Sequence, residues 1–185
     1  MTYIDYSDSD FYSKIKQLLL ERGKKVELGR GYVLCQAGEM TSGIGLLVSG
    51  ALKYSRTLNN GSERIVWFSF TGDLVACCSG TCNNFPNLLD IVAMENSLIY
   101  QLPVEQIDAH LGHEFISHLA EAMCYQLLKS TIDDYSQSPE ERYMALTERF
   151  PDIHNRMTNR TIASYLGITP ESLSRLRKRL LTKQP

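Results

Sequence analysis

Hydrophobic residues change their spacing twice along the chain, which divides the sequence into a helical start, a β-rich middle and a helical end. Apolar residues between Phe11 and Leu19 recur at helical intervals, and Gly23 follows them as a residue that can end a helix. From Lys24 to about Pro103, short apolar runs alternate with turns rich in glycine and polar residues. This middle pattern predicts many short strands.

The predicted strands are rich in β-branched and aromatic residues, and turn-forming residues separate them. They are the runs Lys25–Leu28, Tyr32–Cys35, Gly45–Val48, Ala51–Leu58, Arg64–Phe70, Leu89–Ala93 and Ser97–Leu102. The clearest turn signal is the pair Asn60 and Gly61, which tolerates the positive φ angles of a tight hairpin turn. Many short strands at nearly regular spacing predict an antiparallel sandwich or barrel.

After Pro103 the pattern predicts a short helix at Val104–Leu111, a long one at about Glu114–Tyr135 and a third at Glu140–Phe150. A polar hinge at Ser136–Pro139 separates the last two. The long helix carries an apolar stripe formed by Ile116, Leu119, Ala120, Met123, Leu127 and Thr131. The stripe extends further along the helix than a small barrel would cover. We therefore expect the helix to pair with a second copy in a homodimer. Packing on the chain's own barrel is the alternative.

The composition is that of an ordinary folded protein, with 43% hydrophobic and 22% charged residues over a length of 185 residues. This length suits one domain or two small ones. The N-terminus lacks the basic start and apolar core of a secretion signal. No apolar run approaches the roughly 20 residues that cross a bilayer. We therefore expect a cytoplasmic protein with no membrane partner.

Three of the five cysteines, Cys77, Cys78 and Cys82, lie close together in the sequence. Adjacent cysteines rarely ligate one metal with good geometry, and no nearby histidine completes a set of four ligands. We therefore expect thiols that bind no metal and no cofactor. His110, His113 and His118 surround the start of the long helix, but His110 and His113 lie on either side of Gly112 and are not expected to share a helical face. The sequence accordingly predicts no enzyme.

The charge is distributed unevenly along the chain. Residues 138–185 hold nine lysines and arginines against five acidic residues, a net charge of +4. The first 137 residues hold ten lysines and arginines against sixteen acidic residues, a net charge of −6. A basic end on an acidic body indicates an anionic partner for the end alone. A solvated helix surface would give the same count, so charge alone does not decide the function.

The segment Met157–Arg179 has the features of a helix-turn-helix. Thr158 can cap a first helix, and Gly167 supplies the left-handed residue of a tight turn. Thr169 can cap a second helix, with Pro170 at its first position. The residues expected between the two helices are Ile162, Ala163, Leu166, Ile168, Leu173 and Leu176.

The second helix of a helix-turn-helix enters the major groove of double-stranded DNA with its N-terminal end toward the bases. Arg175 suits bidentate contact with guanine, and Glu171 can accept a hydrogen bond from cytosine. Nearby candidates for base or phosphate contacts are Thr169, Pro170, Ser172 and Ser174. Arg160, Arg177, Lys178 and Arg179 are better suited to phosphate contacts. A helical hairpin with a basic surface that never touches DNA is the alternative.

From about Lys24 onward the chain resembles the cyclic-AMP receptor and fumarate–nitrate regulator (Crp/Fnr) family of bacterial transcription factors. The resemblance is carried by Ala37–Glu39, Gly45–Gly50, Thr71–Val75, the long helix and the helix-turn-helix, in the family's order. The segment Tyr165–Arg175 is similar to the branch typical of Bacteroidetes. The resemblance implies a homodimeric, DNA-binding transcription regulator, with RNA polymerase as a further candidate partner.

The implied fold class is α+β. An N-terminal antiparallel β-barrel of the double-stranded β-helix, cyclic-nucleotide-binding-like type occupies residues 1–112. A long dimerisation helix follows at 113–137, and an all-α helix-turn-helix domain at 138–185. Few residues follow the recognition helix, so we expect this domain to lack the family's usual β-hairpin wing.

The family's cyclic-nucleotide binders hold the ribose with a glutamate and the cyclic phosphate with an arginine and a serine or threonine. Counted without gaps from Gly72, these positions hold Cys77, Asn87 and Leu88. Without the arginine, nothing compensates the cost of burying a phosphate, so we expect no cyclic nucleotide to bind. The polar pair that contacts the base in the cyclic-AMP receptor is matched by Ser130 and Thr131, for which packing at the surface or at an interface is the alternative role.

The sequence leaves open an unknown effector in a rebuilt pocket, whose candidate residues are Val75, Cys77, Leu88, Leu89, Ser130 and Thr131. It also leaves open a sensor of small molecules or partner proteins whose helix-turn-helix has lost its function. The family's iron–sulfur sensors use an N-terminal cysteine cluster, and residues 1–30 contain no cysteine.

Overall fold

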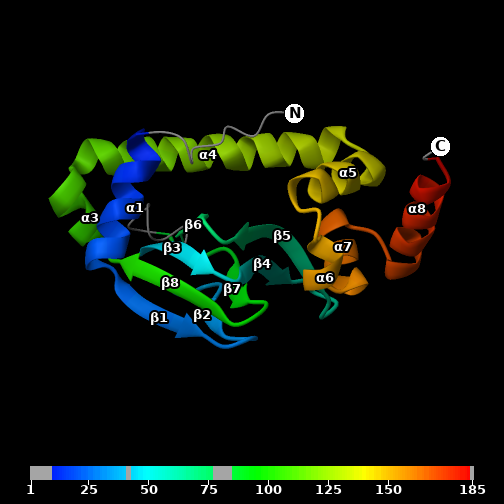
Figure 1. Cartoon of the computed structure of the whole chain (residues 1–185), viewed down its shortest axis with the longest axis horizontal. Coiled ribbons are helices and arrows are strands. Elements are labelled where there is room, and N and C mark those ends of the chain that lie inside the picture. Colours follow the sequence, from blue (N-terminus) through cyan, green and yellow to red (C-terminus); the bar gives the residue numbers. More distant parts are fainter. Residues whose placement is uncertain (1–9, 41–42, 77–84, 184–185) are drawn as a thin grey trace. The chain divides into compact units, whose positions relative to one another are not determined.

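The computed structural model describes residues 10–40, 43–76 and 85–183, which form two compact units. The first unit comprises the chain up to Arg56 together with Trp67–Ala122. The second comprises Thr57–Val66 and the chain from Met123 onward. The predicted α+β class is confirmed, because antiparallel sheets make up the first unit and helices most of the second (Figure 1).

Two four-stranded antiparallel sheets carry the β-rich part of the chain. One sheet has the order β1-β8-β3-β6, with β1 at Lys24–Leu28, β3 at Ile44–Ser49, β6 at Leu74–Ala76 and β8 at Ser97–Leu102. The other has the order β2-β7-β4-β5, with β2 at Val33–Cys35, β4 at Ala51–Thr57, β5 at Glu63–Phe70 and β7 at Asp90–Ala93. The seven predicted strands are present, and the sequence pattern missed β6, which has only three residues.

A hydrophobic core joins strands of both sheets. Its members are side chains that alternate along the strands, as expected of sheets that bury one face. They are Leu28, Cys35, Leu47, Leu52, Val75, Ile91, Ala93 and Ile99. Cys35 therefore serves as a buried apolar residue. The close set Cys77, Cys78 and Cys82 lies outside the described residues.

The hairpin between β4 and β5 turns at Asn60 and Gly61, as the sequence predicts. Among the described residues, only glycines have a positive φ, and at this turn Gly61 alone has one, +76°. A two-residue type I′ turn requires it at both positions. Instead the backbone N–H of Leu58 donates to the carbonyl of Ser62 at 2.8 Å, and the Asn60 side chain accepts from the Ser62 N–H at 3.0 Å. The N–H of Gly61 also donates to the carbonyl of Leu58 at 2.9 Å, so the predicted tight turn is present, as a three-residue loop between Leu58 and Ser62 that ends in left-handed Gly61.

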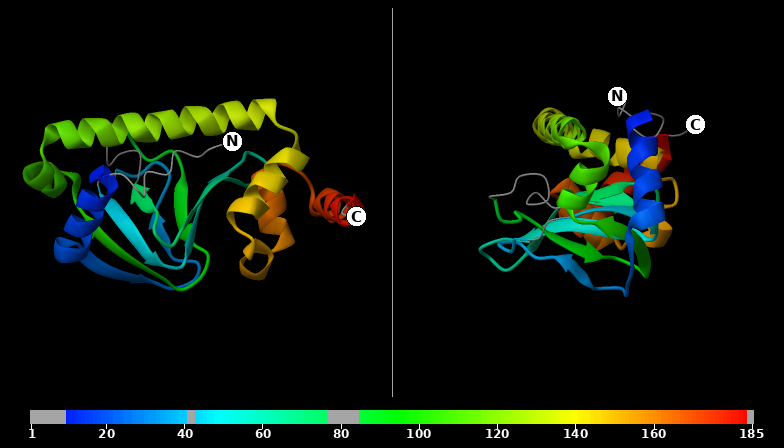
Figure 2. Two further views of the ribbon diagram at one scale, coloured as in Figure 1. Left: turned by 45° about the horizontal axis from the view of Figure 1, so that its top comes forward. Right: turned by 90° about the vertical axis from the view of Figure 1, so that its left-hand side faces the viewer.

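Helices flank the sheets of the first unit. Helix α1 (Asp10–Arg22) lies against β8 and β3 (Figure 2), and the backbone N–H of Gly23 donates to the carbonyl of Leu19 where the helix ends. Helix α3 (Val104–Leu111) ends at Gly112 as predicted. The long helix α4 (His113–Ser136) begins here, and its Phe115 ring stacks on Phe11 at 4.0 Å between centroids.

The second unit contains the end of α4 and four further helices, α5 (Pro139–Arg149), α6 (Ile153–Arg156), α7 (Asn159–Leu166) and α8 (Pro170–Lys183). The short α6 was not predicted. Ser138 and Glu141 form a reciprocal capping box at the start of α5: the Ser138 hydroxyl accepts from the Glu141 N–H, and the Glu141 carboxylate accepts from the Ser138 N–H. These hydrogen bonds lower the pKa of Glu141.

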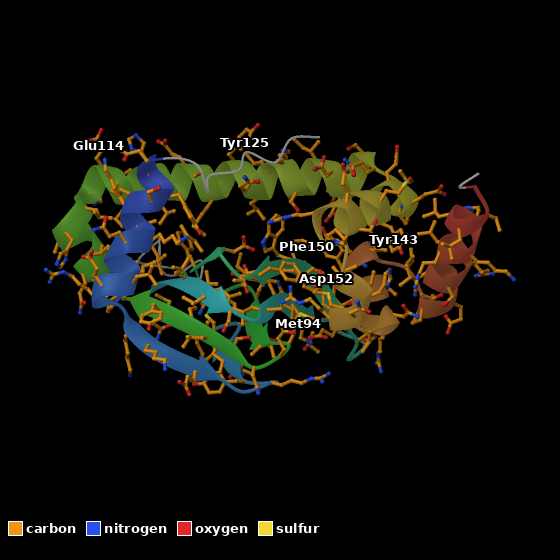
Figure 3. All side chains as sticks on the ribbon, viewed as in Figure 1. Met94, Glu114, Tyr125, Tyr143, Phe150 and Asp152 are labelled. Atoms are coloured by element: carbon orange, nitrogen blue, oxygen red, sulfur yellow. The ribbon has the colours of Figure 1, made fainter. Side chains whose placement is uncertain are left out.

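The predicted stripe on α4 divides into two parts. Ile116 and Leu119 are buried, whereas Leu127 is 60% exposed. A second apolar set, Tyr125, Leu128, Ile132 and Tyr135, is between 51% and 90% exposed. Figure 3 shows Tyr125 projecting away from the helix.

Within the described residues, no helix combines the length and apolar character needed to cross a membrane.

Candidate nucleic-acid interface

Helix α7 begins and ends as the sequence predicts. The Thr158 hydroxyl accepts a hydrogen bond from the backbone N–H of Thr161 at 3.2 Å and so caps the first turn. Gly167 ends the helix in the left-handed conformation, with φ 71° and ψ 27°. The Ile168 N–H then donates to the carbonyl of Ala163 at 3.0 Å, which closes the turn. These contacts fix the direction in which the chain enters α8.

Helix α8 starts at Pro170 and is capped by Thr169, whose hydroxyl accepts from the Ser172 N–H at 3.2 Å. Leu173 is fully buried and Leu176 nearly so. They share the interior of this unit with buried residues of α7, namely Ile162, Ala163 and Leu166. The predicted helix-turn-helix is therefore present, with its apolar side inward.

The opposite side of α8 faces solvent. The exposed candidate residues are Thr169, Pro170, Glu171, Ser174, Arg175, Lys178 and Arg179, and Ser172 is half-buried. Arg160, in the first turn of α7, is also exposed, and Arg177 is half-buried. The side chains of the predicted reading face thus do not pack into the interior.

Three arginines of α8 already contact neighbouring side chains. Arg175 donates to the Ser172 hydroxyl at 3.4 Å, which is a long and weak hydrogen bond. Arg177 donates to the Asn159 carboxamide at 3.0 Å, and Arg179 forms an ion pair with Glu140 of α5. Arg175 is therefore the least constrained of the three, whereas Arg177 and Arg179 also hold the helices together.

Glu171 is held in its charged form at the first turn of α8. Hydrogen bonds from its own backbone N–H and from the Thr169 hydroxyl lower the pKa of the carboxyl group, and Arg175 adds a smaller electrostatic contribution. A carboxylate accepts hydrogen bonds but donates none. At neutral pH this position therefore suits an amino group, such as that of cytosine, and repels a phosphate.

The tip of the β4–β5 hairpin contacts α7, which the sequence did not predict. The Ser164 hydroxyl donates to the carbonyl of Glu63 at 2.8 Å and accepts from the N–H of Ile65 at 3.2 Å. The guanidinium of Arg64 lies over Gly167, so close that a Cβ there would come within 2.4 Å of its Nη1 atom. These partners are about a hundred residues apart in the sequence, so no local sequence pattern predicts that they are in contact.

His154, in α6, is a second residue that sequence reasoning missed. Its Nε2 atom lies 2.7 Å from the hydroxyl of buried Tyr143, and Arg177 of α8 is close enough to act on it electrostatically. Burial, and secondarily the charge of Arg177, lower the pKa of His154. The folded unit therefore favours the neutral imidazole.

Acidification is expected to destabilise the second unit through His154. Its pKa is lowered from about 6.5 on folding, so the unfolded chain binds more protons just below that pH. The contribution is complete above about pH 6.5 and declines as the pH falls toward the folded pKa. The melting temperature of wild type should fall more steeply between pH 7.5 and 5 than that of His154→Gln. His113→Gln, at a histidine whose side chain is 86% exposed, should behave like wild type. Equal slopes for wild type and His154→Gln would contradict the assignment.

The predicted effector residues do not gather into one described site. Val75 is buried in the core, Leu88 is exposed and Leu89 is half-buried. Cys77 lies outside the described residues. Ser130 and Thr131 belong to the second unit, where the Thr131 hydroxyl donates to the carbonyl of Leu127 at 2.8 Å.

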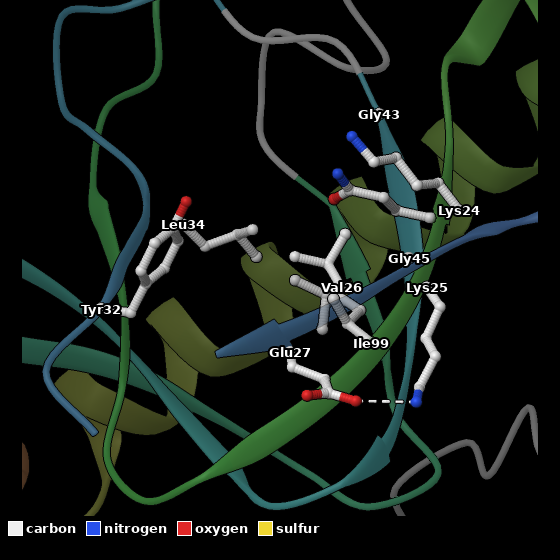
Figure 4. A pocket seen from close by; sticks show the side chains of 11 residues that line it. Lys24, Lys25, Val26, Glu27, Tyr32, Leu34, Gly43, Gly45 and Ile99 are labelled. Atoms are coloured by element: carbon white, nitrogen blue, oxygen red, sulfur yellow. Dashed lines mark hydrogen bonds and ion pairs between the residues drawn. The ribbon is translucent and has the colours of Figure 1, made fainter. Parts of the chain in front are cut away.

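A cavity of about 510 Å³ opens in the first unit, and of the predicted pocket residues that the structure describes, only Val75 lines it. Lys24 and Gln101 are directly paired across β1 and β8, and Gly45 pairs with Gln101 across β3, so all three lie in one row at this cavity. Figure 4 shows Val26 and Ile99 within it and the Lys25–Glu27 ion pair, of 2.7 Å, at one side. Each partner of that pair shifts the pKa of the other toward the charged form, chiefly through their hydrogen bond.

Comparison with known proteins matches residues 25–113 to the cyclic nucleotide-binding domain family. The fumarate and nitrate reduction regulatory protein of Escherichia coli is 27% identical over 176 residues, which covers 85% of this chain and 68% of that protein. The protein of the same name from Vibrio cholerae is 27% identical over 184 residues, which covers 89% of this chain and 71% of that protein.

Solved structures share the fold. FixK2 from Bradyrhizobium japonicum superposes with a TM-score of 0.72 at 19% identity, over 87% of this chain and 85% of that one. The catabolite activator protein of Thermus thermophilus gives a TM-score of 0.55 at 18% identity, over 92% of this chain and 84% of that one. Both the β-rich first unit and the helical second unit thus have counterparts in known regulators. Membership of the Bacteroidetes-type branch stays a prediction. By sequence and by fold, the chain belongs to the Crp/Fnr family of transcription regulators.

Proposed function

We propose that this chain binds double-stranded DNA as a homodimer and reads a two-fold-symmetric site with helix α8. The exposed side of α8 carries this proposal: Leu173 and Leu176 anchor the helix from one side, which leaves Glu171 and Arg175 in solvent on the other. A recognition helix needs this division between an anchored face and a reading face. The positive charge of residues 138–185 favours a polyanionic partner.

The exposed apolar face of α4 supports a second copy as its partner. Tyr125, Leu128, Ile132 and Tyr135 follow one another at spacings of three, four and three residues, which is the spacing of a coiled-coil seam. Four large apolar side chains more than half exposed along one face of a helix are unusual for a monomer. Two copies of this helix, packed along that face, give the two-fold axis that a symmetric operator requires.

Selection of bound fragments from random DNA, in parallel with and without cell extract, tests the proposal. We expect purified protein to enrich a sequence with two inverted half-sites, and the affinity to fall steeply with salt concentration. Enrichment only with extract would identify a required effector. Tight binding of a small molecule, combined with no DNA binding in either arm, would favour a sensor whose helix-turn-helix has lost its function.

Cyclic AMP is not expected to bind, in contrast to what the name of the matched domain family suggests. At the position of the phosphate-binding arginine stands Asn87, which is 97% buried and whose backbone forms hydrogen bonds with Gly38 at 2.8 Å and Glu39 at 2.9 Å. A ligand that binds the folded state raises the melting temperature. Millimolar cyclic AMP should therefore leave it unchanged, as should the linear control 5′-AMP. A rise produced at micromolar concentrations by cyclic AMP alone would refute this expectation.

A further inference from the structure

A single arginine connects three helices of the second unit. The Arg142 side chain, in α5, is only 10% exposed. Its Nη2 atom forms an ion pair with the carboxylate of Asp134, near the end of α4, at a distance of 2.8 Å. The same atom donates to the backbone carbonyl of Tyr165, in the last turn of α7, at 2.9 Å. The guanidinium also lies 5.7 Å from the centre of the Tyr165 ring.

The chemistry of the three partners explains why an arginine stands here. The last carbonyls of a helix have no partner within the helix and carry its negative dipole end, so a cation beside Tyr165 is favourable. Asp134 supplies the opposite full charge, and the planar guanidinium can donate in several directions at once, which an ammonium group does less well. Because the guanidinium is buried, removal of one partner leaves a charge or carbonyl poorly satisfied.

The contact has a geometric consequence that an isolated ion pair would lack. Asp134 and Arg142 lie on opposite sides of the joint between α4 and α5, and Tyr165 lies just before the turn that leads into α8. The ion pair between Arg179 and Glu140 connects only α8 with α5, and the Arg179 side chain is 56% exposed. Of these two pairs, only that of Arg142 ties the helix-turn-helix to the long helix.

We infer that Arg142 is a positioning residue, which sets the direction of the helix-turn-helix relative to α4 and thereby the half-site spacing that a dimer accepts. This inference rests on the proposed function. In a dimer paired along α4, the angle between α4 and α7 determines how far apart the two copies of α8 lie. One base pair moves a half-site by about 3.4 Å and turns it by about a tenth of a helical turn. A fixed angle therefore selects one spacing.

The test measures affinity for a set of DNA duplexes that carry the two selected half-sites, with their centre-to-centre spacing changed one base pair at a time. Asp134→Asn removes the charge on α4 and leaves the contact of Arg142 with Tyr165. Arg142→Lys keeps the charge and loses the planar fork. Glu140→Gln is the matched control, since it also removes a carboxylate partner of an arginine but leaves the connection to α4 intact.

We expect the preference of wild type for its best spacing over the neighbouring spacings to fall about fivefold or more in Asp134→Asn and Arg142→Lys. Affinity for a single half-site should stay within about twofold, and Glu140→Gln should keep the wild-type preference. A preference that is unchanged in folded Asp134→Asn, with only a lower melting temperature, would overturn the inference and leave Arg142 a structural residue. If wild type binds no DNA, the proposed function itself fails. If Arg142→Lys does not fold, Asp134→Asn decides the question.

Discussion

Arg175→Ala is expected to weaken binding of the selected operator by about 30-fold or more. A bidentate contact with guanine contributes about 1–3 kcal/mol of discrimination. A two-fold-symmetric site uses two copies of the residue, so about 2–6 kcal/mol is lost, and each 1.4 kcal/mol is a factor of about ten. Arg175 is exposed and makes only a long hydrogen bond with Ser172, so the substitution should leave the fold intact. Quantitative gel retardation against operators with each base pair substituted measures the effect.

Lys178→Ala provides the matched control for Arg175→Ala. Lys178 is exposed on the same helix and suits a phosphate contact, so its loss should weaken all sequences alike and reduce the salt dependence. Arg179→Ala, the more obvious phosphate variant, is less clean because Arg179 also pairs with Glu140. If Arg175→Ala lowered the affinity for operator and random DNA by the same factor, Arg175 would not be a base-reading residue.

Ile132→Glu is expected to convert the dimer to monomer and to abolish operator binding at concentrations where wild type is saturated. The side chain is 59% exposed in the single chain, so the charge costs little there. Pairing of two copies along this face of α4 would bury two like charges without partners, at a cost of several kcal/mol per ion. Sedimentation velocity and gel retardation on the same samples measure both effects.

Ser117→Glu is the control for Ile132→Glu, because it adds the same charge at an exposed position in the N-terminal half of α4, outside the Tyr125–Tyr135 face. We expect this variant to remain dimeric and to bind DNA. A dimeric Ile132→Glu protein that still binds the operator would show that the copies associate through another surface.

The helix-turn-helix could be predicted from sequence because its determinants are local. Its caps and turn act through hydrogen bonds and φ angles within a few residues, at Thr158, Gly167, Thr169 and Pro170. Signals of this kind can be recognised in the sequence of any helix. The strands and the long helix follow from periodicity in the same way. What was missed is either very short, as β6 and α6 are, or depends on contacts between distant segments.

The contacts of the β4–β5 hairpin with α7 show the second limit. Ser164 bonds to the backbone of Glu63 and Ile65, and any residue type presents the same backbone groups, so the hairpin sequence carries no mark of this contact. At the turn of this hairpin, Asn60 and Gly61 predicted where the chain reverses because they tolerate positive φ angles, but the number of residues in the loop is set by where the strand pairing of β4 and β5 stops. The buried partners of Arg142 likewise become visible only once three helices are placed together.

The joint between α4 and α5 has a consequence for how regulators of this kind diverge. Only Gln137 and Ser138 separate the two helices, and both are engaged: the Gln137 N–H donates to the carbonyl of Asp133 at 2.9 Å, and Ser138 shares the capping box with Glu141. Because both linker residues are held by hydrogen bonds, we expect a substitution at either of them to change the angle between α4 and α5. Under the proposed function, substitutions at this elbow would change the operator spacing without any change in the residues proposed to read the bases.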